Sequence, residues 1–219
     1  MSIASPLAPL AANGPLPKNG VTDVSPSPVW RLSVEQYHEM IRTGILNNGD
    51  PIELLEGVLV PKMTRNPPHR IAVTQLRDLL MRLVGSGWHV ETQEAITLET
   101  SEPEPDLAVI RGTVRDYPDR HPGPHDIGLV VEVADTSLAH DRGQKKRVYA
   151  RAGIVEFWIV NLIDEQIEVY SDPTGPVAPS DQSQQPDYRQ RLVFTSGQSA
   201  PVTLDGVEVG SIAVSQVLP

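Results

Sequence analysis

Two short and almost wholly apolar segments, residues 106–111 and 127–133, constrain the fold of this chain more than any other feature. Runs of this length that are rich in Val, Ile and Leu are typical of central strands, which are covered on both faces of a sheet. Residues 90–98 alternate in polarity and indicate another strand, and the segments 155–161 and 166–170 are typical of a strand pair across a short turn. The sequence therefore predicts a sheet with a buried centre and helices on its faces.

Helical periodicity supplies the elements that could cover such a sheet. It is strongest over residues 69–84, where apolar positions recur at helical spacing and stop at a Gly-Ser-Gly sequence. A second helix is expected over residues 141–152, with Asp141 as its N-cap and a glycine after its end. A short helix is expected over residues 33–44, where a capping box begins it and a glycine closes it. This order of elements favours an α/β or α+β fold.

The rest of the chain divides into a tail, a hairpin, a loop and terminal strands. Residues 1–29 are rich in Pro, Ser and Ala without a hydrophobic period, so we expect a disordered tail. Two apolar runs on either side of Glu56-Gly57 predict a hairpin over residues 52–60. Residues 171–187 are rich in Pro, Ser and Gln and predict a flexible loop before last strands at 188–194 and within 202–214. We therefore expect residues 30–219 to form a single domain.

Composition limits the functions that this fold could serve. Without cysteine, disulfides and thiolate metal sites are excluded, and any metal must be held by oxygen or imidazole. The formal net charge of −10 counts against sequence-independent binding to nucleic acid. The chain nevertheless contains a basic run, which could bind nucleic acid. It consists of Arg142, Lys145, Lys146, Arg147 and Arg151. The usual interpretation of such a run is a solvated helix face.

Nothing in the sequence points to a membrane or to export. No apolar run approaches the roughly 18 residues of a membrane span. The first residues lack the basic start and continuous apolar stretch of a secretory signal. We therefore expect a cytoplasmic protein without a membrane partner.

Three charged side chains stand where a packed sheet would not accept them unpaired. Asp106 opens one of the apolar segments, and Glu132 lies inside the other. Lys145 shares a helix face with apolar side chains, because the residues three, four and seven positions later are Val148, Tyr149 and Ala152. Buried charges are rare unless they are paired or bind metal, since loss of hydration costs several kcal/mol per ion. A lysine aimed at two carboxylates would satisfy all three.

The same three residues could hydrolyse phosphodiesters if a divalent cation joined them. Carboxylates would hold the metal, which activates water and polarises a phosphoryl oxygen, and the ammonium would stabilise the developing charge. Hard oxygen ligands suit Mg²⁺ or Mn²⁺. The residues therefore favour a metal-dependent nuclease centred on Asp106, Glu132 and Lys145.

Each of these residues also has a simpler interpretation. Asp106 could be a turn residue at the start of a strand. Glu132 could occupy a solvent-facing strand position, although Val131 and Val133 would then both face inward. Lys145 could extend from the edge of its apolar stripe to water.

Three earlier residues are secondary candidates. Glu53 and Glu56 could be an outward charge and a turn residue of the predicted hairpin, or could supply a further carboxylate for the metal. His69 follows two prolines and could be a surface residue at a helix end, or an imidazole near the phosphate.

Several short motifs occur in order along the chain. They are Ile52-Glu53-Leu54 with Gly57, then His69, Pro105-Asp106, Val131-Glu132-Val133, Asp141-Arg142-Gly143 with Lys145, Tyr149, Ala152-Gly153, and Glu156-Phe157-Trp158-Ile159-Val160. Together they resemble the Uma family of predicted endonucleases, a branch of the PD-(D/E)XK nuclease superfamily. The likeness spans roughly residues 30–218, and its most specific part is residues 141–160.

The resemblance implies a restriction-endonuclease-like fold, in which helices flank a mixed central sheet and an N-terminal hairpin and C-terminal strands are added. It also implies divalent-metal catalysis and a homodimer. It makes Asp106 and Glu132 metal ligands, with the Val133 carbonyl as a further ligand. It makes Glu53 a supporting carboxylate, and Tyr149 joins the supporting candidates.

The chain departs from the superfamily at one position. The superfamily usually places its lysine two residues after the strand glutamate, where this chain has Ala134. The family moves this lysine to the following helix at Lys145, which becomes the transition-state cation. The helical spacing around Lys145 agrees with that assignment without using the resemblance.

Three functions are therefore expected, in this order. The first is a magnesium-dependent endonuclease that cuts DNA. The second is a binding or scaffold module that keeps the nuclease fold without cutting, which the acidic charge would permit. The third is a nuclease that acts on RNA or on single strands.

Overall fold

A computed structural model describes residues 29–47, 49–63, 65–179, 181 and 185–219. The chain divides into two units, Met1–Trp30 and Arg31–Pro219, and every described helix and strand belongs to the second. Of the tail predicted at residues 1–29, all but Val29 lies outside the described residues. No described helix is both long enough and apolar enough to cross a membrane.

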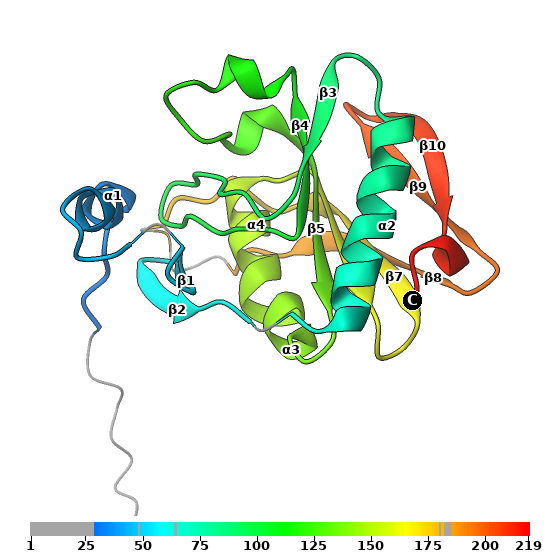
Figure 1. Ribbon diagram of the computed structural model, residues 1–219, viewed down its shortest axis with the longest axis horizontal. Coiled ribbons are helices and arrows are strands. Elements are labelled where there is room, and N and C mark those ends of the chain that lie inside the picture. The colour runs from blue at the N-terminus through cyan, green and yellow to red at the C-terminus, as the bar shows by residue number, and fades with distance from the viewer. Residues whose placement is uncertain (1–28, 48, 64, 180, 182–184) are drawn as a thin grey trace, which may run out of the picture. The chain divides into compact units, whose positions relative to one another are not determined.

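One mixed sheet forms the centre of the second unit (Figure 1). Its strands, in spatial order, are β3 (Trp88–Glu91), β4 (Leu107–Arg111), β5 (Ile127–Ala134), β6 (Glu156–Asn161), β7 (Gln166–Pro173) and β8 (Tyr188–Thr195). β5 and β6 are parallel, and the other neighbours are antiparallel. The two apolar segments of the sequence form β4 and β5, which are interior strands of this sheet and are buried except at Arg111.

The parallel pair is joined by one helical crossover. It consists of α3 (Leu138–His140), a π-helical turn (Asp141–Lys145) and α4 (Lys146–Ala152), which follow one another without a break and are called the crossover helix below. Gly153 ends it in the left-handed conformation, at φ 76°, which glycine adopts without strain. Parallel strands need such a crossover because a tight turn cannot connect them.

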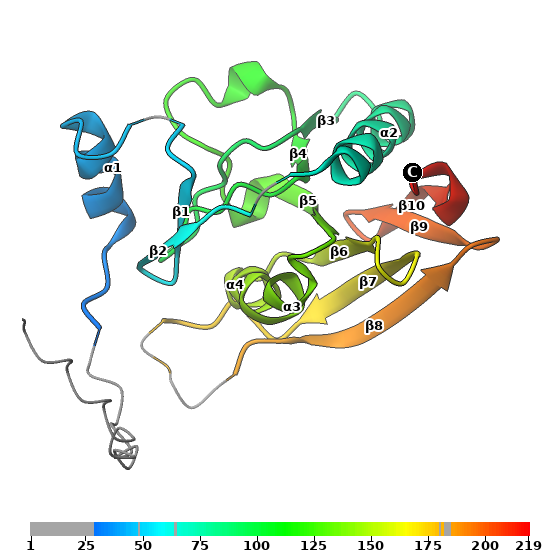
Figure 2. The ribbon, with the colours of Figure 1, turned by 60° about the horizontal axis from the view of Figure 1, so that its bottom comes forward.

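Helices and a second hairpin cover the two faces of the sheet (Figure 2). α2 (Pro67–Leu83) and the hairpin of β9 (Ser199–Leu204) and β10 (Val207–Ala213) pack on one face, against side chains such as Val131 and Trp158. The crossover helix packs on the other face, against Val130, Phe157 and Ile159. Side chains of the central strands thus alternate between two cores, as their twofold period requires. The mixed, helix-flanked sheet agrees with the predicted fold class.

The N-terminal part of the unit is a helix and a hairpin. They are α1 (Val34–Arg42), β1 (Ile52–Leu55) and β2 (Val58–Pro61). α1 begins with the predicted capping box, in which Ser33 and Gln36 exchange side-chain and backbone hydrogen bonds. The turn needs Gly57, because a Cβ there would lie 2.7 Å from the Arg31 Cβ and 2.9 Å from the Leu32 oxygen. Short 3-10 turns complete the unit at Val114–Asp116, Pro124–Asp126 and Val214–Gln216.

Several element boundaries differ from the predicted ones. The strand predicted at residues 90–98 ends at Glu91, because Gln93 takes a left-handed conformation at φ 59° and breaks the ladder. Its alternation is a burial pattern without pairing, since Ile96 and Leu98 still point into a core. α2 begins at Pro67 rather than His69, with Asn66 as its N-cap.

Two further boundaries lie near the crossover. Asp141 was predicted to cap the second helix, but helical structure already begins at Leu138, so Asp141 lies inside it. β7 extends to Pro173, three residues into the loop predicted at 171–187, because Ser171 and Pro173 pair with β8. Part of that loop lies outside the described residues.

Candidate active site

A polar pocket opens where β4 begins and β5 approaches its end. Its lining residues come from β1, the segment just before β4, β5, the start of α2 and the crossover helix, and include Glu53, His69, Asp106, Glu132, Asp141 and Lys145. Leu107 pairs with Val131 in the antiparallel ladder of β4 and β5. The preceding residue, Asp106, is therefore the neighbour of Glu132 across the two strands.

Asp106 is held by two groups at one of its oxygens. Its Oδ2 accepts a hydrogen bond from the Val133 N–H at 2.9 Å and lies 3.0 Å from the His69 Nε2. Both Asp106 and His69 are buried. The Nδ1 of His69 is also buried and has no partner among the described residues, so this imidazole serves Asp106 alone. His69 is therefore a residue that orients a carboxylate.

Glu132 is likewise held at one oxygen. Its Oε1 accepts a hydrogen bond from the Tyr149 hydroxyl at 2.6 Å and lies 3.2 Å from the Lys145 Nζ. Burial raises the pKa of Glu132 to about 8, because the carboxylate has lost its hydration and Lys145 offsets only part of that loss. A further cation beside Glu132 would favour its ionised form.

Lys145 bridges two carboxylates. Its Nζ lies 2.7 Å from the Glu53 Oε2, and both side chains are only 5% exposed. The Glu53 Oε2 also accepts the backbone N–H of Glu104 at 3.1 Å. Burial alone would lower the pKa of Lys145, but the charges of Glu132 and Glu53 outweigh burial and raise it. Lys145 is therefore a fixed cation inside the pocket.

The local geometry of the crossover helix sets the direction of Lys145. Lys145 ends the π-helical turn, and turns of this kind are rare and occur frequently at functional sites. Val148 and Tyr149 follow it on the buried face, as the helical spacing predicted. The structure thus brings Lys145, Glu132, Asp106 and Glu53 together in the pocket.

Glu56 is not part of this group. It lies in the tight turn between β1 and β2, where its carboxylate receives the Arg147 guanidinium at 2.6 Å and lies 3.7 Å from Arg151. The hydrogen bond from Arg147 lowers the pKa of Glu56, the opposite of the direction for Glu132. Glu56 therefore neutralises cations on the outer side of the crossover helix.

The basic run of the sequence is largely neutralised within the protein. Lys145 faces the pocket, Arg147 and Arg151 meet Glu56, and the Lys146 Nζ lies 2.7 Å from the Asp187 carboxylate. Arg142 binds Glu168 on β7. The run is therefore a set of ion pairs rather than a free basic patch.

Asp141 is a pocket residue that the sequence interpretation missed. It is buried, and its Oδ2 accepts the Ser137 hydroxyl at 2.6 Å. Burial raises the pKa of Asp141 to about 6. One signal could have found it, since Asp141 and Lys145 are four residues apart and thus share a helix face. His140, half-buried beside it, also lines the pocket.

The pocket offers a small set of oxygen ligands. Among the described residues, no three His, Asp or Glu side chains converge as a ready-made metal cage. Asp106 Oδ1 and Glu132 Oε2, however, accept no hydrogen bond from any described residue. The Val133 carbonyl projects to the same side of β5 as its N–H, toward Asp106. This donor set fits Mg²⁺, which takes one or two carboxylates and keeps much of its water.

Comparisons with known proteins agree with this architecture. Residues 34–203 match the model of the Uma2 family, whose description is "Putative restriction endonuclease". A crystal structure from Anabaena variabilis, described as "a putative nuclease belonging to DUF820", has a similar fold, with a TM-score of 0.60 at 12% identity. The match covers 85% of this chain and 97% of that one. No curated protein matches the chain.

Proposed function

We propose that this chain, which belongs to the Uma2 family described as "Putative restriction endonuclease", is a divalent-metal-dependent endonuclease of the PD-(D/E)XK type whose substrate is DNA. One observation carries the proposal. The Lys145 ammonium lies 2.7 Å from Glu53 and 3.2 Å from Glu132, and Asp106 neighbours Glu132 on the adjacent strand. A fixed cation and two neighbouring carboxylates in one pocket suit the hydrolysis of a phosphodiester.

Each of the chain's own groups has a distinct part in this proposal. Asp106 and Glu132 would hold the metal through the oxygens that are free of hydrogen bonds, with the Val133 carbonyl as a further ligand. His69 and Tyr149 orient these two carboxylates. Lys145, which is already charged and buried, would stabilise the negative charge that develops on the phosphate. When bound, Mg²⁺ or Mn²⁺ would supply Lewis-acid polarisation of the phosphate and a more acidic water.

The position of the lysine supports this arrangement. At the place where the superfamily usually carries its lysine, this chain has Ala134, which is fully buried and carries no charge. Lys145 comes instead from the crossover helix, which packs on the same face of the sheet as Glu132. A lysine ammonium can thus reach the Glu132 carboxylate from the crossover helix instead of from β5. The homodimer that the family resemblance implies stays a prediction.

A cleavage assay with three substrates tests the proposal. The protein is incubated with supercoiled DNA, single-stranded DNA and RNA, each with Mg²⁺, with Mn²⁺ and with a chelator. We expect metal-dependent nicking of the supercoiled DNA that the chelator abolishes. The double variant Asp106→Asn with Glu132→Gln should cut nothing, which excludes a contaminating nuclease.

The other outcomes would point to different functions. Cleavage of RNA or single strands alone would keep the catalytic site and change the substrate. Absence of cleavage on all three substrates would overturn the proposal in favour of a binding module with a nuclease fold. Because most cations of the basic run already form ion pairs within the protein, few of them can contact phosphates. The affinity for a long duplex should therefore be low.

A further inference from the structure

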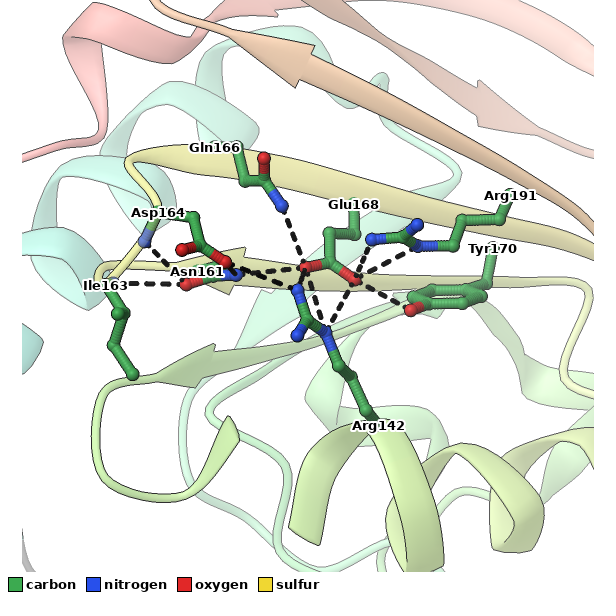
Figure 3. Close-up of polar contacts among 8 residues, drawn as sticks. All are labelled: Arg142, Asn161, Ile163, Asp164, Gln166, Glu168, Tyr170 and Arg191. Carbon is green, nitrogen blue, oxygen red and sulfur yellow. Dashed lines mark hydrogen bonds and ion pairs between the residues drawn. The ribbon is translucent and has the colours of Figure 1, made fainter. Parts of the chain in front are cut away.

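A second buried carboxylate, Glu168, lies on the same face of the sheet as Glu132 but outside the pocket. Its side chain is fully buried. Arg142 and Arg191 bind it as ion pairs, and Tyr170, Asn161 and Gln166 donate hydrogen bonds at 2.7 Å, 3.0 Å and 3.1 Å (Figure 3). Both oxygens of Glu168 thus accept hydrogen bonds from four different elements, which are β6, β7, β8 and the crossover helix.

These donors keep Glu168 ionised despite its burial. Burial alone would raise the pKa, but the hydrogen bonds from Arg142, Tyr170 and Asn161 outweigh it and bring the pKa to about 2. A buried ion pair is a weak source of net stability, because an apolar residue of similar size often serves as well. The proposed chemistry does not use Glu168 either. The role of Glu168 therefore depends on which neighbouring segments its ion pairs hold in place.

The strand register places Glu168 in one row with Glu132. Glu132 pairs with Ile159 across β5 and β6, and Ile159 pairs with Glu168 across β6 and β7. The two carboxylates are therefore two strands apart, roughly 10 Å at the usual strand spacing. The crossover helix lies over this row and sends one cation to each end, Lys145 to Glu132 and Arg142 to Glu168.

The two cations lie in the same π-helical turn. Arg142 and Lys145 are three residues apart within Asp141–Lys145. The turn is thereby fastened to β7 at Arg142 and to β1 and β5 at Lys145. Arg142 also lies 3.5 Å from Asp164, and Asn161 accepts backbone N–H groups of Ile163 and Asp164, so the turn between β6 and β7 is fixed with it (Figure 3).

We propose that the Glu168–Arg142 pair is a positioning device that holds the π-helical turn in the register that delivers Lys145 to Glu53 and Glu132. The device rests on the proposed function, in which Lys145 stabilises the transition state. Without the anchor at Arg142, the turn can relax toward regular α-helix, and the Lys145 ammonium shifts from its place. Neither Arg142 nor Glu168 lines the pocket, so both would act only through Lys145.

Arg191 provides a matched control. It binds the same carboxylate of Glu168, through Oε2 alone, and the side chains of Arg142 and Arg191 are similarly exposed, at 35% and 46%. Arg191, however, lies on the edge strand β8, opposite Tyr170. Among the described residues, it binds Glu168 and forms no hydrogen bond or ion pair with the crossover helix. Its loss removes a cation from Glu168 without releasing the turn that carries Lys145.

The experiment compares Arg142→Ala, Arg142→Lys and Arg191→Ala in two measurements. The first is steady-state cleavage of supercoiled DNA with Mg²⁺. Arg142→Ala should lower kcat by up to roughly 10²-fold, as expected for a catalytic group displaced by about 1 Å, with little change in KM. Arg142→Lys keeps the charge and should recover part of the rate. Arg191→Ala should keep the rate of the unmodified protein.

The second measurement needs no activity. Reductive methylation, read lysine by lysine by mass spectrometry, should modify Lys145 slowly in the unmodified protein, because its ammonium is buried and paired. Its rate should rise in Arg142→Ala and not in Arg191→Ala, whereas Lys62 should be unaffected in both. If the unmodified protein cuts nothing, the proposed function fails, and methylation alone still decides the positioning role. Equal effects of the two alanine variants on kcat, or on Lys145 methylation, would overturn it.

Discussion

The Lys145 ammonium lies 2.7 Å from the Glu53 carboxylate, although the two residues are 92 positions apart in the sequence. Glu53 comes from the short hairpin strand β1, outside the central sheet, and Lys145 from the crossover helix. Their contact therefore ties the N-terminal hairpin to the centre of the pocket. The Lys145 ammonium thus contacts both Glu53 and Glu132 and does not pair with Glu132 alone.

Neutralisation of Glu53 should lower the rate without removing metal binding. In Glu53→Gln, Lys145 loses one of the two charges that raise its pKa and moves closer to Glu132, where it competes with the metal. We expect reduced kcat, and metal affinity that is weakened but still measurable. Cleavage kinetics and titration calorimetry with Mn²⁺ give the two quantities. An unchanged kcat would show that Glu53 only stabilises the fold.

Metal binding should depend on Asp106 and Glu132 together. Two buried carboxylates on neighbouring strands repel one another without a cation, so Mg²⁺ or Mn²⁺ should stabilise the folded protein and raise its Tm. The variant Asp106→Asn with Glu132→Gln should lose this increase in Tm and the calorimetric signal. Glu56→Gln, which alters a carboxylate outside the pocket, is the control and should keep both. Divalent binding that survives the double change would place the metal elsewhere.

The centre of the site follows from local sequence patterns. The apolar segments around Asp106 and Glu132 predicted central strands, and the helical spacing of Lys145, Val148 and Tyr149 predicted which face the lysine takes. These features depend on periods of two and 3.6 residues, which a sequence displays directly. The alignment of Asp106 with Glu132 needed one more fact, the register of β4 on β5, which no local pattern gives.

Local sequence patterns do not show which residues far apart in the chain contact one another. The assignment of Asp141 as an N-cap followed the usual rule for an aspartate before a helical period, but three residues before it are already helical. The network at Glu168 joins donors from β6, β7, β8 and the crossover helix, and only the fold brings these together. The segment 92–98 shows the converse error, because its alternation reflects burial of Ile96 and Leu98 without strand pairing.

A buried carboxyl group far from the pocket should make stability depend on pH. Burial raises the pKa of Glu156 to about 7, although the Trp158 N–H donates to it at 2.7 Å. Since the folded state holds this proton more tightly than the unfolded chain, stability is full below about pH 4.5 and is lost as the pH rises toward 7. In Glu156→Gln this loss should disappear, so the variant gains stability over the unmodified protein as pH rises.

Urea unfolding between acid and neutral pH measures this difference. The gain should amount to a few kcal/mol at most. Glu208→Gln on β10 changes an exposed carboxylate and should leave the pH profile as it was. A parallel profile for Glu156→Gln and the unmodified protein would mean that Glu156 is ionised at no cost in the fold.

The sharpest prediction separates Lys145 from its neighbour Lys146, which has the same charge on the next position of the helix. Lys146 is turned about 100° around the axis and pairs with the half-exposed Asp187. If Lys145 stabilises charge on the phosphate, Lys145→Ala should lower cleavage by about 10²- to 10³-fold, the usual loss for one transition-state donor. Lys146→Ala removes a surface ion pair worth about 1 kcal/mol or less and should change mainly the salt dependence of DNA affinity.

Removal of Lys145 leaves Glu53 and Glu132 buried without their cation, so folding must be checked by thermal melts before the rates are compared. Lys145→Arg, which keeps the charge in a different shape, is the second variant and should fold while still cutting more slowly than the unmodified protein. Metal affinity, cleavage rate and salt-dependent binding are then measured for all three variants side by side. Equal loss of rate in Lys145→Ala and Lys146→Ala would make the crossover helix a general basic surface. A fully active Lys145→Ala protein would remove this lysine from the mechanism, because no other described cation reaches both Glu53 and Glu132.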